Sequence, residues 1–98
     1  MFTVIETPDF QDQAAKIWTQ TELHAFIDWI AENPLAGDVI PAAQGARKVR
    51  WAVAGRGKRG GVRVVYFNLS VAGVLVLIAI YAKNEQSNIL GKDIKKPT

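Results

Sequence analysis

The 98-residue sequence predicts one α+β domain in which a helical hairpin packs on an antiparallel sheet. In the first half, apolar residues recur with the 3.6-residue period of helices, whereas the second half alternates or runs apolar as strands do. Hydrophobic residues make up 49% of the chain, which is enough for a core, and there is no cysteine to form a disulfide. The expected order of elements is β-α-α-β-β-β.

A short strand and two helices are expected in the first half. Residues 2–5 are rich in residues that favour strands. Asp9 is the expected N-cap of a helix over residues 10–18. A second helix is expected to begin at Thr21 and to end at Asn33, because a residue that precedes a proline resists the helical conformation.

Three strands are expected in the second half, over residues 48–53, 62–69 and 74–82. The last one is apolar almost throughout, which indicates a central strand covered on both faces. It is too short for a membrane-spanning helix, which needs roughly 20 residues, and the N-terminus does not look like a secretory signal. We therefore expect a cytoplasmic protein without membrane contact, with one domain over residues 1–90 and a basic, mobile tail over residues 91–98.

Charge is divided sharply along the chain. Residues 1–46 contain seven acidic side chains and a single basic one, Lys16. Residues 47–63 contain seven basic side chains and no acidic one. This asymmetry indicates a polyanion-binding face on an otherwise acidic protein.

Three segments of the second half resemble the RelE/HigB toxins of bacterial toxin–antitoxin pairs, and most closely the HigB-like branch. They are ARKVRWA at residues 46–52, GRGKRGGVRVVYF at residues 55–67 and IYAKNE at residues 80–85. With the strand and two helices before them, the resemblance covers roughly residues 2–90. It implies a RelE-like fold and ribosome-dependent, metal-independent cleavage of mRNA without a cofactor. It also implies silencing by a partner antitoxin, often of the helix-turn-helix type, which would supply any contact with DNA.

RNA cleavage without a metal ion needs a base for the 2′-hydroxyl, stabilisation of the phosphate and a proton for the leaving oxygen. The single histidine, His24, lies in the acidic half and is expected to be an ordinary helix residue. The resemblance therefore assigns catalysis to Lys48 as general base and to Arg50 and Arg63 as clamps on the phosphate. Tyr81, at the end of the last strand, is added as support for a base or a phosphate.

Seven further residues are expected to contact RNA through charge or stacking. For Trp51 a place in the core is equally expected, and Tyr66 could instead be a half-buried strand residue. The glycine-rich segment over residues 55–61 lacks the Gly-Lys-Ser/Thr of a phosphate-binding P-loop, and it could also be a mobile hairpin tip. The seven residues are Arg47, Trp51, Arg56, Lys58, Arg59, Tyr66 and Lys83.

Two departures from the family keep another function open. Some RelE members carry an arginine and a tyrosine where this chain has Asn84 and about Leu90. A non-cleaving module that binds RNA or the ribosome is therefore the first alternative. A DNA-binding repressor component is a weaker one, because both expected helices are acidic. The sequence leaves open whether an antitoxin covers the basic site or docks on the acidic helical hairpin.

Overall fold

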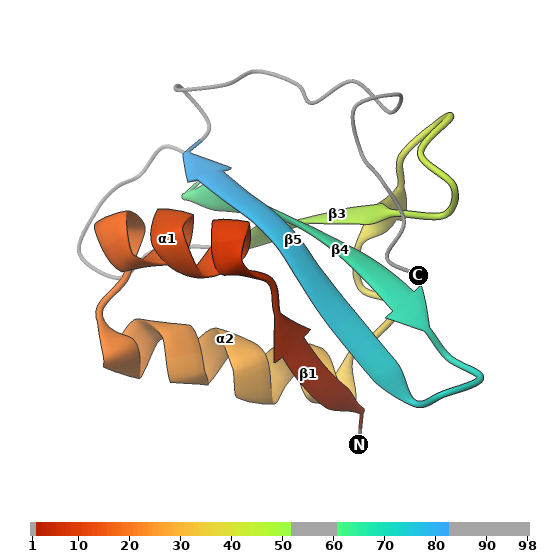
Figure 1. The fold of residues 1–98 in the computed structure, drawn as a ribbon, viewed down its shortest axis with the longest axis horizontal. Helices are drawn as coiled ribbons and strands as arrows, with labels where there is room; N and C mark the ends of the chain where they lie inside the picture. The colour runs from red at the N-terminus through yellow and green to blue at the C-terminus, as the bar shows by residue number, and fades with distance from the viewer. Residues whose placement is uncertain (1, 52–60, 83–98) are drawn as a thin grey trace.

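The computed structural model describes residues 2–51 and 61–82, which form one sheet with two helices on one face (Figure 1). The order of strands across the sheet is β1-β5-β4-β3-β2. Residues 1, 52–60 and 83–98 lie outside the described part, and with them the end of the strand expected over residues 48–53 and the basic tail. The elements are β1 (Thr3–Glu6), α1 (Pro8–Ile17), α2 (Gln20–Glu32), β2 (Asp38–Val39), β3 (Arg47–Trp51), β4 (Val62–Leu69) and β5 (Val74–Ala82).

Both helices begin at threonine caps rather than at the expected residues. Thr7 caps α1 by accepting a hydrogen bond from the Phe10 amide, so the N-cap lies two residues before Asp9. Thr19 caps α2 in a reciprocal capping box with Glu22, at distances of 2.8 and 3.2 Å. Threonine and aspartate compete at such positions, and here Pro8 at the first helical position favours the earlier start.

The sheet is mixed rather than antiparallel, and it contains one strand more than expected. β1 pairs with β5 in parallel, from Thr3 opposite Val74 to Glu6 opposite Leu77. The two strands are far apart in the sequence, so no hairpin turn dictates their relative direction. The additional strand, β2, has only two residues and pairs with β3 at the opposite edge.

The sheet separates two apolar clusters. The larger one lies between the sheet and the helices and includes Phe10, Phe26, Val64 and Leu77. The smaller one lies on the opposite face, called here the distal face, and consists of Ala43, Ala46, Val65, Phe67 and Tyr81. β5 contributes to both clusters, which confirms a central strand covered on both faces.

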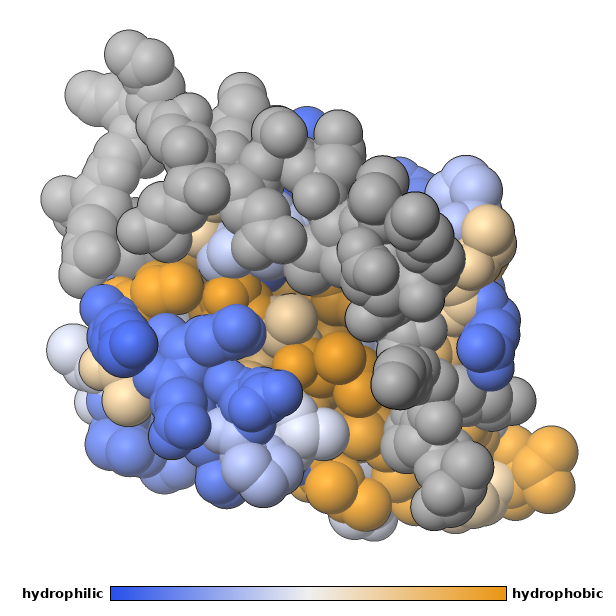
Figure 2. All heavy atoms as spheres, turned by 45° about the horizontal axis from the view of Figure 1, so that its top comes forward, coloured by the Kyte–Doolittle hydropathy of each residue, from blue (hydrophilic) through white to orange (hydrophobic). Residues whose placement is uncertain are grey.

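Part of the apolar surface of the sheet stays visible. Figure 2 shows an apolar band over β5 beside the hydrophilic surface of α1. Ile5 on the neighbouring edge strand is 47% exposed. Within the described ranges, neither helix is long and apolar enough to cross a membrane.

Candidate functional site

The strand register brings three of the expected catalytic residues into one row across the sheet. Arg50 on β3 lies directly opposite Arg63 on β4, and Arg63 lies directly opposite Tyr81 on β5. Residues paired in this way point to the same face, with Cβ atoms about 5 Å apart. Because Tyr81 packs in the distal cluster, the row lies on the distal face.

Lys48 lies on the same face, one step along β3. It is two residues from Arg50 and opposite Val65, which belongs to the distal cluster. Lys48 and Arg63 are half-buried and Arg50 is exposed. We call Lys48, Arg50, Arg63 and Tyr81 the distal row; it presents three cations beside an apolar floor.

A β-bulge directs Tyr81 to this face. Leu75 and Leu77 of β5 point toward the helices, and strict alternation would send Tyr81 to the same side. Between Val65 and Tyr66 of β4 the register shifts, so that Ile78 has no partner in the β4 pairing. Beyond the bulge the alternation is reversed, which puts Ile80 in the helix-side core and Tyr81 beside Arg63.

Tyr81 combines burial with an unused hydrogen-bonding group. Its side chain is 5% exposed, and its hydroxyl has no hydrogen-bond partner among the described residues. Burial raises the pKa of the Tyr81 hydroxyl above its usual value of 10.0, and the positive charge of Arg63 partly offsets this. The hydroxyl therefore stays protonated at neutral pH, as a buried donor close to Arg63.

Arg47 does not belong to the distal row. It precedes Lys48 on β3 and so points to the other side of the sheet, where it is opposite Tyr66. Its guanidinium group donates hydrogen bonds to the carbonyl oxygens of Leu35, at 3.4 Å, and Gly37. These contacts give Arg47 a structural task, in place of the expected contact with RNA.

Tyr66 is buried in the helix-side core, so the expected RNA contact of Tyr66 is wrong. It is 0% exposed, and its hydroxyl donates to the Pro34 carbonyl and accepts from the Gly37 amide, both at 3.0 Å. Asn68 donates to the same Pro34 carbonyl at 3.2 Å. Burial raises the pKa of the Tyr66 hydroxyl above its usual value of 10.0, and the hydrogen bond with Gly37 and the charge of Arg47 partly offset this.

These contacts fix the segment that connects α2 to β2. Gly37 in this segment lies so close to β3 that a Cβ atom would come within 2.8 Å of the Lys48 carbonyl oxygen. The segment thus packs directly against the backbone of Lys48 on β3. Gly37 and Asn68 were not predicted from the sequence. The one available signal was a tyrosine within the otherwise apolar run of residues 64–67, because a tyrosine hydroxyl needs a partner when it is buried.

Trp51 packs among aromatic rings of α2, which favours the core position over stacking on RNA. Its ring centroid is 5.2 Å from that of Phe26, in an edge-on geometry, and 5.0 Å from that of Trp29. Trp18 lies 5.3 Å from Phe26 and is buried. Trp18 and Trp29 are thus packing residues, and His24 is an exposed residue of α2, as expected.

The remaining expected site residues lie outside the described part of the chain. They include the expected phosphate contacts of the glycine-rich segment and the positions that depart from the family. Among the residues of ranges 2–51 and 61–82, no three acidic, histidine or cysteine side chains are grouped so that they could hold a metal ion. The residues of these two groups that lie outside the described ranges are Arg56, Lys58, Arg59, Lys83, Asn84 and Leu90.

Two solved structures share this architecture, although no protein-family model matches the sequence. One is a mutant of the Escherichia coli toxin RelE in its free state, with a TM-score of 0.63, 13% identity, and coverage of 88% of this chain and 87% of that chain. The chain has the RelE fold. The intact E. coli RelBE toxin–antitoxin complex gives a TM-score of 0.61 at 16% identity, over 88% of this chain and 100% of the matched chain. The expected fold class is therefore confirmed, while membership of the HigB-like branch stays a prediction.

Proposed function

We propose that this protein is the toxin of a toxin–antitoxin pair and that it cleaves mRNA on the ribosome without a metal ion. The observation that carries the proposal is the distal row, in which Lys48, Arg50, Arg63 and Tyr81 share one face of a RelE fold. The row offers three cations and one hydroxyl donor, which are the groups that phosphodiester cleavage without histidine requires.

In the proposed reaction, Lys48 accepts the proton of the 2′-hydroxyl, and the resulting oxygen attacks the adjacent phosphorus. Arg50 and Arg63 bind the non-bridging oxygens and stabilise the additional negative charge of the pentavalent state. The bond to the 5′-oxygen breaks as that oxygen takes a proton from water, and Lys48 returns its proton to the solvent, leaving a 2′,3′-cyclic phosphate and a free 5′-hydroxyl. Tyr81 donates a hydrogen bond to the phosphate between these two events.

The RNA-binding set is proposed to be smaller than the sequence suggests. Arg56, Lys58, Arg59 and Lys83 remain candidates for contacts with phosphates along the message. Arg47, Trp51 and Tyr66 leave the set, because their side chains are engaged on the helix side of the sheet.

The proposed partners are the ribosome, its mRNA and a cognate antitoxin, for which a helix-turn-helix protein fits the HigB-like resemblance. One of the structural neighbours is an intact toxin–antitoxin complex. Such an antitoxin would also provide any contact with promoter DNA. The proposed location is the cytoplasm, where translating ribosomes are found.

The test is to add the purified protein to programmed ribosomes and, separately, to the same mRNA without ribosomes, and to map new 5′ ends by primer extension. Each new 5′ end is then identified as a hydroxyl or a phosphate. Arg63→Ala removes one cation of the distal row, and Lys16→Ala removes an exposed cation of α1 as the matched control.

Cuts that need the ribosome, carry a 5′-hydroxyl and disappear in Arg63→Ala but not in Lys16→Ala are the expected result. Cuts that carry a 5′-phosphate instead would reject the proposed attack by the 2′-hydroxyl. If the protein binds ribosomes but produces no cuts, the alternative of a non-cleaving module replaces the enzyme.

A further inference from the structure

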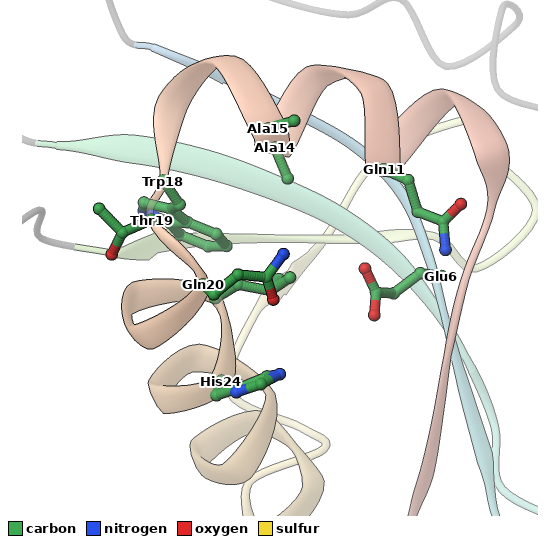
Figure 3. A pocket seen from close by; sticks show the side chains of 9 residues that line it. Glu6, Gln11, Ala14, Ala15, Trp18, Thr19, Gln20 and His24 are labelled. Atoms are coloured by element: carbon green, nitrogen blue, oxygen red, sulfur yellow. The ribbon is translucent and has the colours of Figure 1, made fainter.

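A cavity lies between the two helices and the end of β1, on the side of the molecule opposite the distal row (Figure 3). Its volume is about 260 Å³. The proposed cleavage of RNA uses none of the residues that line it. Its walls combine the apolar side chains of Ala14, Trp18 and Leu23 with polar groups from three different elements.

Glu6 supplies the charge of this cavity. It alternates with Ile5 on β1, so it lies on the helix side of the sheet, like Val4, which packs against the helix-side core. The Glu6 side chain is half-buried. Among the described residues, its carboxylate forms neither a hydrogen bond nor an ion pair. A carboxylate without a partner at the edge of a cavity can accept hydrogen bonds from a cationic ligand.

The other polar groups face the same space. Figure 3 shows the Gln11 amide from α1 beside the Glu6 carboxylate, and Gln20 and His24 from α2 across the cavity. The two amides offer carbonyl oxygens as additional acceptors. Glu6 and the two amides therefore contribute acceptors to the lining of one cavity, while its apolar wall suits an aliphatic chain.

The helix surface around the cavity is negatively charged, like Glu6. The two helices carry five acidic side chains against one basic one, so their field attracts cations and repels nucleic acid. A ligand with an apolar stem and a cationic end would match the apolar walls of the cavity and the negative potential of the two helices. The acidic residues of the two helices are Asp9, Asp12, Glu22, Asp28 and Glu32.

We propose that the cavity between α1 and α2 receives an arginine side chain of a partner protein. The aliphatic part of the arginine packs on Leu23 and Ala14, and the guanidinium group binds Glu6 through two parallel hydrogen bonds. The remaining guanidinium hydrogens reach the amide oxygens of Gln11 and Gln20. Arginine fits better than lysine, because its planar group presents five donors in fixed directions to acceptors on separate elements.

The test is a titration of the ¹⁵N-labelled full-length protein with two capped tripeptides, Gly-Arg-Gly and Gly-citrulline-Gly, followed by NMR. Citrulline has nearly the same shape as arginine but no charge. Glu6→Gln removes the charge of the cavity with little change in volume. Asp12→Asn removes a charge from exposed α1 surface outside the cavity, and it serves as the matched control.

The expected result is saturable shifts of the Gln11, Gln20 and His24 amides with the arginine peptide. Binding should weaken at least fivefold in Glu6→Gln and for the citrulline peptide, and less than twofold in Asp12→Asn. The proposal is overturned if citrulline binds as well as arginine, if Glu6→Gln and Asp12→Asn have equal effects, or if the shifts spread over both helices. Cleavage of RNA is not measured, so either result is independent of the proposed function.

Discussion

Replacing Tyr66 by phenylalanine should destabilise the protein without removing its proposed activity. The change deletes one oxygen atom, which donates to Pro34 and accepts from Gly37, both at 3.0 Å. The Pro34 carbonyl keeps the hydrogen bond from Asn68, but the buried Gly37 amide loses the partner that it has in Tyr66. An unsatisfied buried group costs about 1–3 kcal/mol. Together with the second lost hydrogen bond, the free energy of unfolding should fall by about 2–3 kcal/mol.

Tyr81→Phe provides the matched control for this experiment. It removes the same atom from another buried tyrosine, but one whose hydroxyl has no partner in the described part of the chain. Its free energy of unfolding should therefore change by less than about 0.5 kcal/mol, or rise. Urea denaturation followed by tryptophan fluorescence measures both variants, and an unchanged m-value would show that the unfolded states are comparable.

The same pair separates structure from function. Under conditions where both variants are folded, Tyr66→Phe should cleave ribosome-bound mRNA within about twofold of the wild type. Tyr81→Phe should lose at least about tenfold, because one donor to the phosphate is gone. A loss of stability below about 0.5 kcal/mol in Tyr66→Phe would refute the anchoring role assigned to its hydroxyl. A stable but inactive Tyr66→Phe would restore Tyr66 to the site.

Three further predictions concern the support of the fold. Gly37→Ala should lower the free energy of unfolding by about 1–3 kcal/mol, because the new Cβ would lie 2.8 Å from the Lys48 carbonyl oxygen. An unchanged midpoint of urea denaturation would contradict this close approach. Thr19→Ala should cost about 1 kcal/mol through loss of the capping box, whereas Thr21→Ala, within the same helix, should cost nothing measurable in urea denaturation. Burial raises the pKa of Tyr66 above 10.0, so the stability linked to its neutral form is present below that pH and is lost as pH rises through the folded-state pKa. The stability of the wild type should fall more steeply above pH 10 than that of Tyr66→Phe, and parallel curves would reject the linkage.

Hydrophobic periodicity and charge were sufficient to predict the helical hairpin and the three long strands. The N-caps Thr7 and Thr19 show that such patterns do not predict the exact residue at which a helix begins. Asp9 and Thr21 are acceptable caps by composition, but Thr7 also donates to the Leu77 carbonyl at 2.8 Å. This contact spans 70 positions of the sequence and has no local signal. The parallel pairing of β1 with β5 is a long-range feature of the same kind.

All four residues of the distal row were named from the sequence, but their arrangement could be predicted only in part, for a similar reason. Alternation along β3 groups Lys48 with Arg50, and the register with β4 adds Arg63. The position of Tyr81 depends on a bulge in β5, which no local pattern indicates. Conversely, Arg47 and Tyr66 carry the residue types expected of an RNA-binding site, but their partners come from the Pro34–Gly37 segment. The residue type alone did not distinguish a ligand contact from an internal anchor.

The most direct measurement of the central claim is the single-turnover rate of mRNA cleavage on programmed ribosomes for Arg50→Ala and Lys16→Ala. Arg50 is the exposed cation of the distal row, and Lys16 is an exposed cation on the helix side. Loss of one group that stabilises the transition state should slow cleavage on the order of 100-fold. The account predicts this loss for Arg50→Ala and a change below about twofold for Lys16→Ala. Equal rates for the two variants, both folded, would contradict the assignment of catalysis to the distal face.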